Sequence, residues 1–260
     1  MTPTLTETGG GPTLPPKNNT SLPSTVEWTG CSGFAILLPS LNEIHKGTLI
    51  PGWGPNSSPF QQIQLDFYKC ERIRWGPFER GPVYMLQEWQ ANFNEPKKCD
   101  EGAVTRAALE SIWFSDSEIA DYARSAYGMP AFATNFTFLR APLAPAGSPH
   151  DWSLTWTPPG GTTSSVTLHS LEPGFNSTVT YEERLFWFNG QGISYFDMSE
   201  RYERSDVGAD HADGILAPPM MWGRDGPTSQ FVTRNANLQG SASVTAKISR
   251  FGDVECTKPL

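Results

Sequence analysis

The chain contains 260 residues, including 24 Gly and 23 Pro, and only 18% of its residues are charged. This size and composition fit one large β-rich domain or two small ones, with many turns and short strands instead of a helical bundle. A formal net charge of −8, with no basic run longer than Lys97-Lys98, disfavours nucleic acid and anionic membranes as partners, and no apolar stretch approaches the roughly 20 residues of a membrane-spanning helix.

The first residues predict how the chain is divided into domains, and the cysteines predict the cellular compartment of the protein. Residues 1–24 are rich in Thr, Pro and Gly and lack the charged and apolar regions of a signal peptide, so we expect a flexible arm followed by a single domain over 25–260. The four cysteines are scattered and form no CxxC pair, which disfavours a structural zinc site and favours free thiols in a cytoplasmic protein: Cys31, Cys70, Cys99 and Cys256.

In chain order, the first half alternates strand-like blocks with turns. An apolar strand is predicted over Ser32–Leu38, followed by one or two helical turns over Leu41–Gly47 with Ser40 as N-cap. Two further strands are predicted on either side of a charged turn at 72–82, and a polar loop over 90–102 follows them: Ile63–Tyr68 and Val83–Trp89.

The second half is predicted to contain one helix and several strands. The segment Val104–Phe114 fits either a strand or a helix, whereas Ser115 as N-cap, with Glu118 three residues later, predicts a helix that ends at Tyr127. Asn189-Gly190 predicts a type I′ hairpin turn. The later strands are predicted from alternating apolar residues and from turn signals: Phe132–Phe138, Trp152–Thr157, Ser165–Leu168, Thr178–Phe188, Ile193–Asp197 and Ser241–Ile248. Together these elements predict one closed or strongly curved antiparallel sheet with a few helices.

Four pieces between Gly33 and Pro130 follow one another in an order that resembles the acetoacetate decarboxylase-like family. They are an apolar strand leading to Leu49-Ile50-Pro51, the strand piece Leu65-Asp66-Phe67, the turn Phe78-Glu79-Arg80-Gly81, and the run from Ala120 that reads ADYARSAYGMP. The likeness covers less than half of the chain and does not extend into its C-terminal half. It implies a mainly β fold with a few helices (α+β), in the form of a closed, cone-shaped antiparallel β-barrel around an apolar pocket.

The resemblance also shows what this chain lacks. Active decarboxylases of the family carry a Schiff-base lysine just before a Gly-x-Pro segment, and here Ser125 and Ala126 stand at the matching positions. The arginine usually found near the first strand has no counterpart either. A Schiff base requires an amine whose pKa is lowered by burial or by a neighbouring cation, and neither serine nor alanine can supply one. The carboxylate pair of the family does match, at Asp66 and Glu79, and the resemblance implies that both face the pocket.

Two carboxylates in an apolar pocket favour general acid–base chemistry, because their pKa values tend to separate. We therefore expect an enzyme of lyase or isomerase/cyclase type that acts on a ketone-bearing, mostly apolar secondary metabolite. We expect that it needs no cofactor and no metal and that its partner is a small molecule, and a homo-oligomer is compatible with this function. Glu79 and Asp66 are the expected catalytic residues, and the expected substrate-binding residues are Trp75, Trp89, Arg124, Ser125, Tyr127 and Met129.

Other interpretations of the acidic residues and of the function stay open. Glu79 in a turn also fits a surface salt bridge with Arg74 or Arg80, and Asp66 also fits the solvent face of its strand. The protein could instead carry a hydrophobic ligand without catalysis. A decarboxylase with a relocated lysine is a further alternative, in which a β-keto acid would be trapped on Lys46, Lys69 or Lys247.

Histidines give no clear metal motif in the sequence. The run from Asp206 to Asp213, which includes His211, could attract a metal, but a solvated loop is the expected structure. His45, His150 and His169 stand alone and lack ligand spacing.

Overall fold

The structure, a computed structural model, describes residues 25–41, 54–55, 60–91, 93–94, 105–140, 151–158, 161–169, 176–189, 193–205, 211–217, 229–234 and 236–250. The expected arm over 1–24 and most of the expected helix over Leu41–Gly47 lie outside these residues. Ser40 and Leu41 themselves belong to a strand, so the prediction that a helix begins there is wrong.

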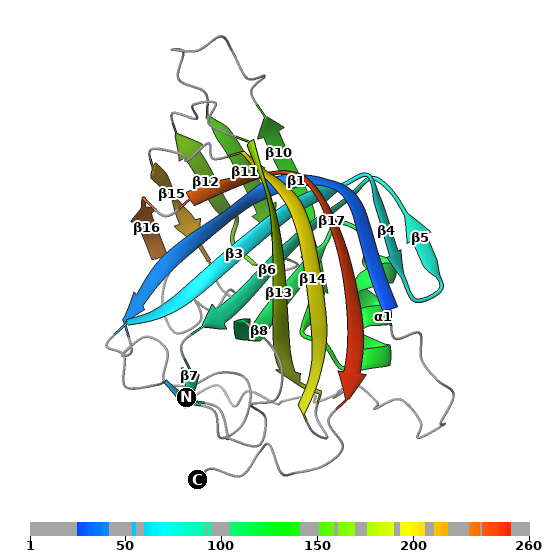
Figure 1. Cartoon of the computed structure of the whole chain (residues 1–260). Helices are drawn as coiled ribbons and strands as arrows, with labels where there is room; N and C mark the ends of the chain where they lie inside the picture. Colours follow the sequence, from blue (N-terminus) through cyan, green and yellow to red (C-terminus); the bar gives the residue numbers. More distant parts are fainter. Residues whose placement is uncertain are drawn as a thin grey trace, which may run out of the picture.

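Ten strands form the larger sheet, and nine of them pair in the order β17, β14, β13, β8, β6, β3, β1, β4 and β5, with β9 beside β8. β17 also pairs with β1, so the path of paired strands returns to its starting strand (Figure 1). The strands are β1 (Thr25–Leu41), β3 (Phe60–Cys70), β4 (Arg72–Trp75), β5 (Phe78–Arg80), β6 (Val83–Ala91), β8 (Thr105–Phe114), β9 (Ala131–Ala133), β13 (Asn176–Phe188), β14 (Ile193–Ser205) and β17 (Ala236–Arg250).

Five further strands form a smaller sheet in the order β10, β11, β12, β15 and β16. Its strands are β10 (Asn135–Arg140), β11 (Trp152–Thr157), β12 (Ser164–His169), β15 (His211–Leu216) and β16 (Ser229–Thr233). A separate short pair consists of β2 (Gly54–Pro55) and β7 (Phe93–Asn94), and the one helix of the described residues is α1 (Ser117–Tyr127). The prediction of a mainly β fold with helical content is confirmed, whereas the second sheet was not predicted.

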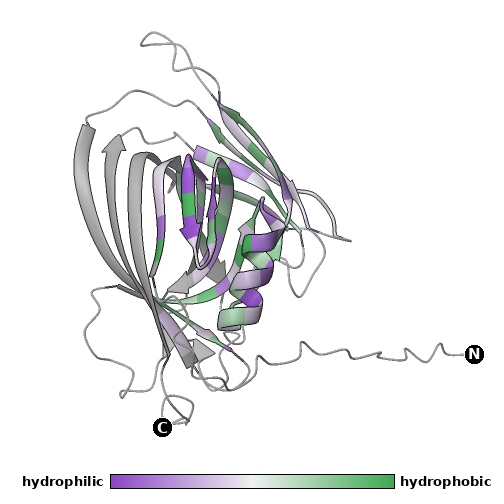
Figure 2. Cartoon of the chain, turned by 90° about the vertical axis from the view of Figure 1, so that its right-hand side faces the viewer, coloured by the Kyte–Doolittle hydropathy of each residue, from purple (hydrophilic) through white to green (hydrophobic). Residues whose placement is uncertain are grey.

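Side chains of β3 and β6 alternate between two cores on opposite faces of the larger sheet. One core, called the inter-sheet core below, lies between the two sheets and includes Leu65, Phe67 and Leu86 together with residues of the smaller sheet. The other, called the helix-side core, contains residues of the larger sheet together with the buried face of α1. Figure 2 shows α1 beside strands of this sheet. Because successive strand residues point to opposite faces, both faces of β3 and β6 are buried and largely apolar over their described side chains.

Helix α1 begins one residue later than its sequence signal predicts. Asp116 is the N-cap, and its side chain accepts a hydrogen bond from the Ile119 backbone N–H (3.0 Å). Ser115 instead accepts a hydrogen bond from the Tyr84 backbone N–H (2.9 Å), which ties the helix start to β6. The predicted end is confirmed, because Gly128 adopts a left-handed conformation (φ 63°) and caps the helix.

Three other predictions of local structure are corrected. The alternating segment Phe132–Phe138 is interrupted at Thr134, so that its two parts join different sheets as β9 and β10. The pairs β8–β13 and β8–β9 are parallel, so the expected sheet is not entirely antiparallel. The charged turn at 72–82 forms the hairpin of β4 and β5. The periodicity of Val104–Phe114 did not distinguish a strand from a helix. In the structure, this segment forms strand β8 from Thr105 onward.

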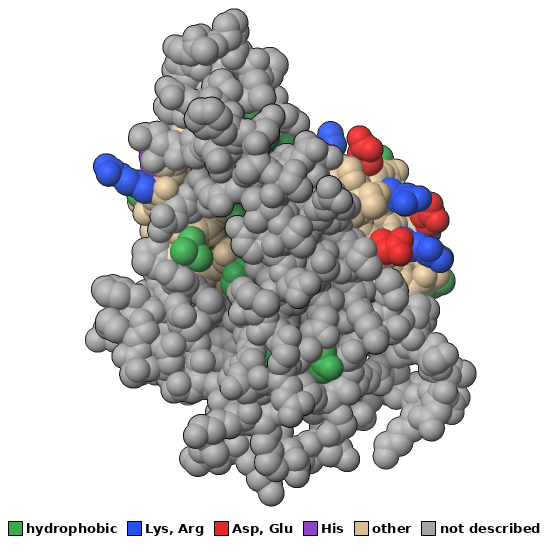
Figure 3. Space-filling model, in the orientation of Figure 1, with side chains coloured by type: hydrophobic (Ala, Val, Ile, Leu, Met, Phe, Trp, Pro, Cys, Tyr) green, Lys and Arg blue, Asp and Glu red, His purple; other side chains and the backbone are tan. Residues whose placement is uncertain are grey.

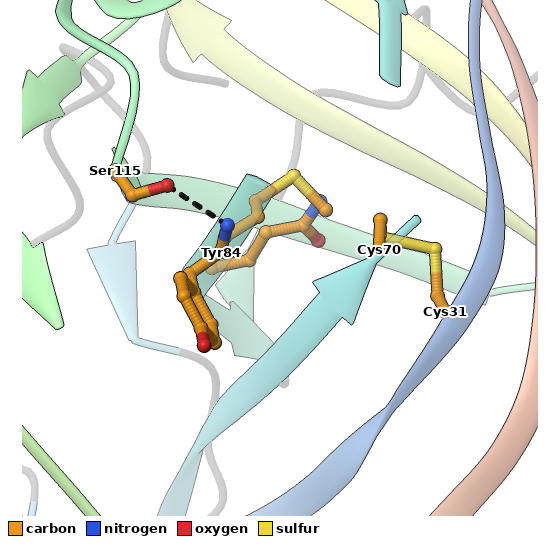
Figure 4. The surroundings of a disulfide bond; sticks show 6 residues. Cys31, Cys70, Tyr84 and Ser115 are labelled. Carbon is orange, nitrogen blue, oxygen red and sulfur yellow. Dashed lines mark hydrogen bonds between the residues drawn. A yellow bond between two sulfur atoms is a disulfide. The ribbon is translucent and has the colours of Figure 1, made fainter. Parts of the chain in front are cut away.

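A disulfide bond joins Cys31 on β1 to Cys70 on β3, so the prediction of free thiols is wrong for these two cysteines (Figure 4). The two residues face each other because β1 and β3 are antiparallel and Ser32 pairs with Lys69. Cys99 and Cys256 lie outside the described residues. Disulfides are rare in the reducing cytoplasm, so this bond favours an oxidising compartment over the expected cytoplasmic one. Within the described residues, no helix has the length and apolar character needed to cross a membrane.

Replacing both Cys31 and Cys70 by Ala should lower the free energy of unfolding by about 2–4 kcal/mol, because the bond restricts the unfolded chain between residues 39 positions apart. Urea denaturation of the wild type and the double variant, with and without a reducing agent, measures this difference. The reducing agent should destabilise the wild type alone. Equal stability of the two proteins in non-reducing buffer would contradict the predicted contribution of the bond.

Candidate functional site

Asp66 is a carboxylate inside the protein, with only 3% of its surface exposed. It lies in the middle of β3, between Ala35 of β1 and Gln87 of β6 in the pairing register. Its neighbours Leu65 and Phe67 point into the inter-sheet core, so Asp66 points to the opposite face of the larger sheet. The alternative in which Asp66 faces solvent is therefore excluded.

Two side chains donate hydrogen bonds to the Asp66 carboxyl group. Trp89 Nε1–H donates to Oδ2 (2.5 Å), and Gln64 Nε2–H donates to Oδ1 (2.8 Å). Burial raises the pKa of Asp66 from its ordinary value of 3.8 to about 6, although both hydrogen bonds act to lower it. The carboxyl group is thus able to gain and lose a proton close to neutral pH.

Gln87 is a second polar side chain on the same face and was not identified from the sequence. It is fully buried and lies directly across from Asp66 in the β3–β6 pair. Its Nε2 has a weak contact with Met85 Sδ (3.9 Å), and its Oε1 has no hydrogen-bond partner among the described residues. Since directly paired strand residues have Cβ atoms about 4.5–5.5 Å apart, the amide and the carboxyl group are neighbours.

Two more buried carboxylates were also missed, Glu88 on β6 and Glu110 on β8. Glu88 accepts a hydrogen bond from Ser111 Oγ (2.8 Å), which itself accepts one from Trp113 Nε1 (2.9 Å). Glu88 alternates with Gln87 along β6 and therefore points away from the Asp66 face. Glu110 is the extra residue where the register between β6 and β8 shifts. The sequence signal was weak, because each glutamate has an apolar neighbour on one side only, Trp89 after Glu88 and Leu109 before Glu110.

Glu79 lies at the surface, so the expectation that it shares a pocket with Asp66 is wrong. Its side chain is 62% exposed and forms an ion pair with Arg72 (3.6 Å). Arg80, on the same hairpin, pairs with Asp116 (3.6 Å) and Glu118 (2.7 Å) near the start of α1. Figure 3 shows acidic and basic side chains gathered on this side of the molecule. The surface salt bridge, considered as an alternative, describes Glu79 correctly, although its partner is neither Arg74 nor Arg80.

The predicted substrate-binding residues divide into a buried and an exposed group. Trp75, Trp89, Tyr127 and Met129 all belong to the helix-side core. Arg124 and Ser125 are on the exposed side of α1: Arg124 bonds Asp121 and the Ala131 carbonyl oxygen (3.1 Å), and Ser125 Oγ donates to the Tyr122 carbonyl oxygen (3.4 Å). None of these hydrogen bonds joins Arg124 or Ser125 to Asp66.

A hollow of about 780 Å³ opens at another place, beside the disulfide. Asp66 is not among its lining residues, which are Gly30, Ser32, Lys69, Glu71, Pro82, Phe138, Leu139, Asp151 and Ser153. Lys69 is exposed and its ammonium group lies 5.9 Å from the centre of the Tyr84 ring. This environment lacks the burial that would activate a relocated Schiff-base lysine. Lys46 and the side chain of Lys247 lie outside the described part of the chain.

Replacing Asp66 by Asn should change how stability depends on pH. The raised pKa means that the folded state holds the proton more tightly than the unfolded state, so ionisation of Asp66 destabilises the fold as pH rises from about 4 to about 7. The shift of about 2 pH units corresponds to about 3 kcal/mol. An asparagine can still accept from Trp89 and donate to the amide oxygen of Gln64.

The measurement is the free energy of unfolding of both proteins across this pH range. The wild type should lose about 3 kcal/mol relative to Asp66→Asn between the two ends of the range. A difference that stays constant with pH would show that Asp66 does not titrate with a raised pKa.

Comparison with known proteins gives distant structural neighbours only: no family model matches, and no curated protein sequence matches. The enduracididine biosynthesis enzyme MppR, complexed with the condensation product of pyruvate and imidazole 4-carboxaldehyde, is 9% identical, with a TM-score of 0.49 over 87% of this chain and 89% of its own. An acetoacetate decarboxylase-like enzyme from Sphingomonas wittichii RW1 is 12% identical, with a TM-score of 0.47 over 89% and 94%.

Acetoacetate decarboxylase from Legionella pneumophila is 9% identical, with a TM-score of 0.44 over 88% of this chain and 90% of its own. Two of these three proteins thus bear the name of the family that the sequence resembles. At these identities and scores the likeness is distant, and no activity is transferred from these proteins to this chain.

Proposed function

We propose that this protein is an enzyme of lyase or isomerase/cyclase type that moves a proton with Asp66. Its substrate is a ketone-bearing, mostly apolar small molecule, and the reaction uses neither a cofactor nor a Schiff base. The observation that carries the proposal is the buried Asp66 carboxyl group, whose pKa is raised to about 6. Perturbed carboxylates of this kind are common where a protein performs acid–base chemistry.

The pKa of Asp66 suits both directions of proton transfer. With a pKa of about 6, the group is about nine-tenths ionised at pH 7, so it can accept a proton from the carbon beside a ketone. The same proton can then be returned to another atom of the substrate, which is the exchange that isomerisation, dehydration and cyclisation require. A positioned general acid–base group contributes roughly 10²–10⁴-fold in rate.

Gln87 supports the negative charge that such a step creates. Removing the proton turns the ketone into an enolate, whose oxygen needs a hydrogen-bond donor. The Gln87 amide nitrogen makes only a weak contact with Met85 sulfur and can exchange it for the enolate oxygen. The helix-side core around Trp89 is apolar, which strengthens such a hydrogen bond and suits the rest of the substrate.

A non-catalytic carrier of hydrophobic molecules is the second candidate. The position of Glu79 favours it, because Asp66 then lacks the second carboxylate that was expected beside it. A carrier would use the same apolar surroundings to bind a ligand but would leave its protons in place.

Asp66→Asn should reduce the rate of deuterium exchange at the carbons beside the ketone by roughly 10²–10⁴-fold, because the general base is lost. The measurement uses NMR in D₂O with a series of methyl ketones of increasing chain length. The exchange rate of the wild type should rise with pH through about 6 and then level off.

Glu79→Gln is the matched control, because it removes an exposed carboxylate and should leave the rate unchanged. Equal exchange by Asp66→Asn and the wild type would exclude Asp66 as the base. Ketones that raise the melting temperature of the wild type but undergo no catalysed exchange would support the carrier.

A further inference from the structure

The outer face of the smaller sheet carries a cluster of two histidines and two aspartates. His169, at the end of β12, pairs directly with His211, at the start of β15. Asp213 follows His211 by two residues, so its side chain projects from the same face of the strand. The neighbours Leu168 and Ala212 point into the inter-sheet core, so the cluster faces away from that core. The two strands lie side by side in Figure 1.

His169 lies between two carboxylates. Its Nε2 is 3.1 Å from Asp213 Oδ2, and its Nδ1 is 3.2 Å from Asp151 Oδ2. A neutral imidazole has one N–H and one lone pair, so it can donate to only one of them. The other nitrogen then presents a lone pair to an oxygen lone pair, unless a positive charge lies between them. The His211 ring, stacked at 4.6 Å between ring centres, places a second imidazole beside this position.

We propose that His169, His211 and Asp213 bind a Zn²⁺ ion, with the Nε2 atom of His169 as one ligand. One nitrogen from each histidine and one Asp213 oxygen all lie within 4.8 Å of one another. Ligand atoms on a tetrahedral zinc ion are about 3.3 Å apart, because each metal–ligand bond is about 2.0–2.2 Å. The separation of His169 Nε2 from Asp213 is already close to this value, and small rotations of the partly exposed side chains can supply the rest.

Asp151 is the positioning residue of this site. A zinc-binding histidine usually donates its second N–H to a carboxylate, which fixes the orientation of the ring. With zinc on Nε2, the Nδ1–H of His169 donates to Asp151, as the 3.2 Å contact allows. Two imidazoles and one carboxylate favour zinc over Mg²⁺ or Ca²⁺, which prefer oxygen ligands. The solvent-facing side leaves a fourth position for water.

Zinc titration of the full chain by isothermal calorimetry, after treatment with a chelator, tests the site. The wild type should bind one Zn²⁺ per chain and should give no heat with Mg²⁺. Asp151→Asn should weaken zinc binding by about 10–100-fold, and His211→Gln should weaken it further. Asp121→Asn is the matched control, since it removes an exposed carboxylate from α1, and it should bind zinc like the wild type.

A second measurement on the wild type avoids any effect of substitution on folding. Zn²⁺ should protect His169 and His211 from modification by diethyl pyrocarbonate, as read by peptide mass spectrometry, and Mg²⁺ should not. Zinc should also raise the melting temperature of the wild type but not that of His211→Gln. An absence of zinc binding, or equal binding by His211→Gln, would overturn the proposal.

Discussion

The alternation of side chains along β3 is the constraint on which the interior depends. Leu65 and Phe67 are held between the two sheets, and this anchors the register of the strand. Because side chains repeat every two residues, Asp66 must then point to the other face, where it meets Gln64, Gln87 and Trp89. A slip by one residue would place the carboxylate in the inter-sheet core and Leu65 among polar groups.

The buried environment of Asp66 disfavours the charged form of its carboxyl group. Two hydrogen bonds to Asp66 favour ionisation, yet burial outweighs them and the pKa remains raised. The side-chain amide oxygen of Gln87, which has no hydrogen-bond partner among the described residues, adds a second unfavourable group at the same place. Stable proteins rarely bury a carboxylate or leave a buried polar atom without a hydrogen bond. Such exceptions tend to occur at functional sites, where a local loss of stability serves chemistry. This is why the β3–β6 face, and not the hollow beside the disulfide, is the candidate site.

Local patterns predicted the strands around Asp66 because the alternation of residues that face opposite sides of the sheet can be read from consecutive positions in the sequence. The family resemblance, and not these patterns, placed Glu79 in a pocket, whereas its orientation depends on how the hairpin pairs: Arg74 faces Glu79 in the register, while Trp75 points inward. The disulfide and the histidine cluster depend on pairing between strands far apart in sequence, as in Ser32 with Lys69 and His169 with His211. Neither spacing carries a recognisable motif, so only the fold brings these residues together.

The pairing of β1 with β17 has a consequence for synthesis of the protein on the ribosome. Thr25 of β1 pairs with Lys247 of β17. During synthesis β1 therefore cannot complete its pairing before β17 has left the ribosome. During that time one edge of β1 presents unpaired backbone groups, which are a template for association with other chains. This edge is therefore open to association with other chains until β17 pairs with it, and a shortened chain that ends before β17 would stay prone to aggregation.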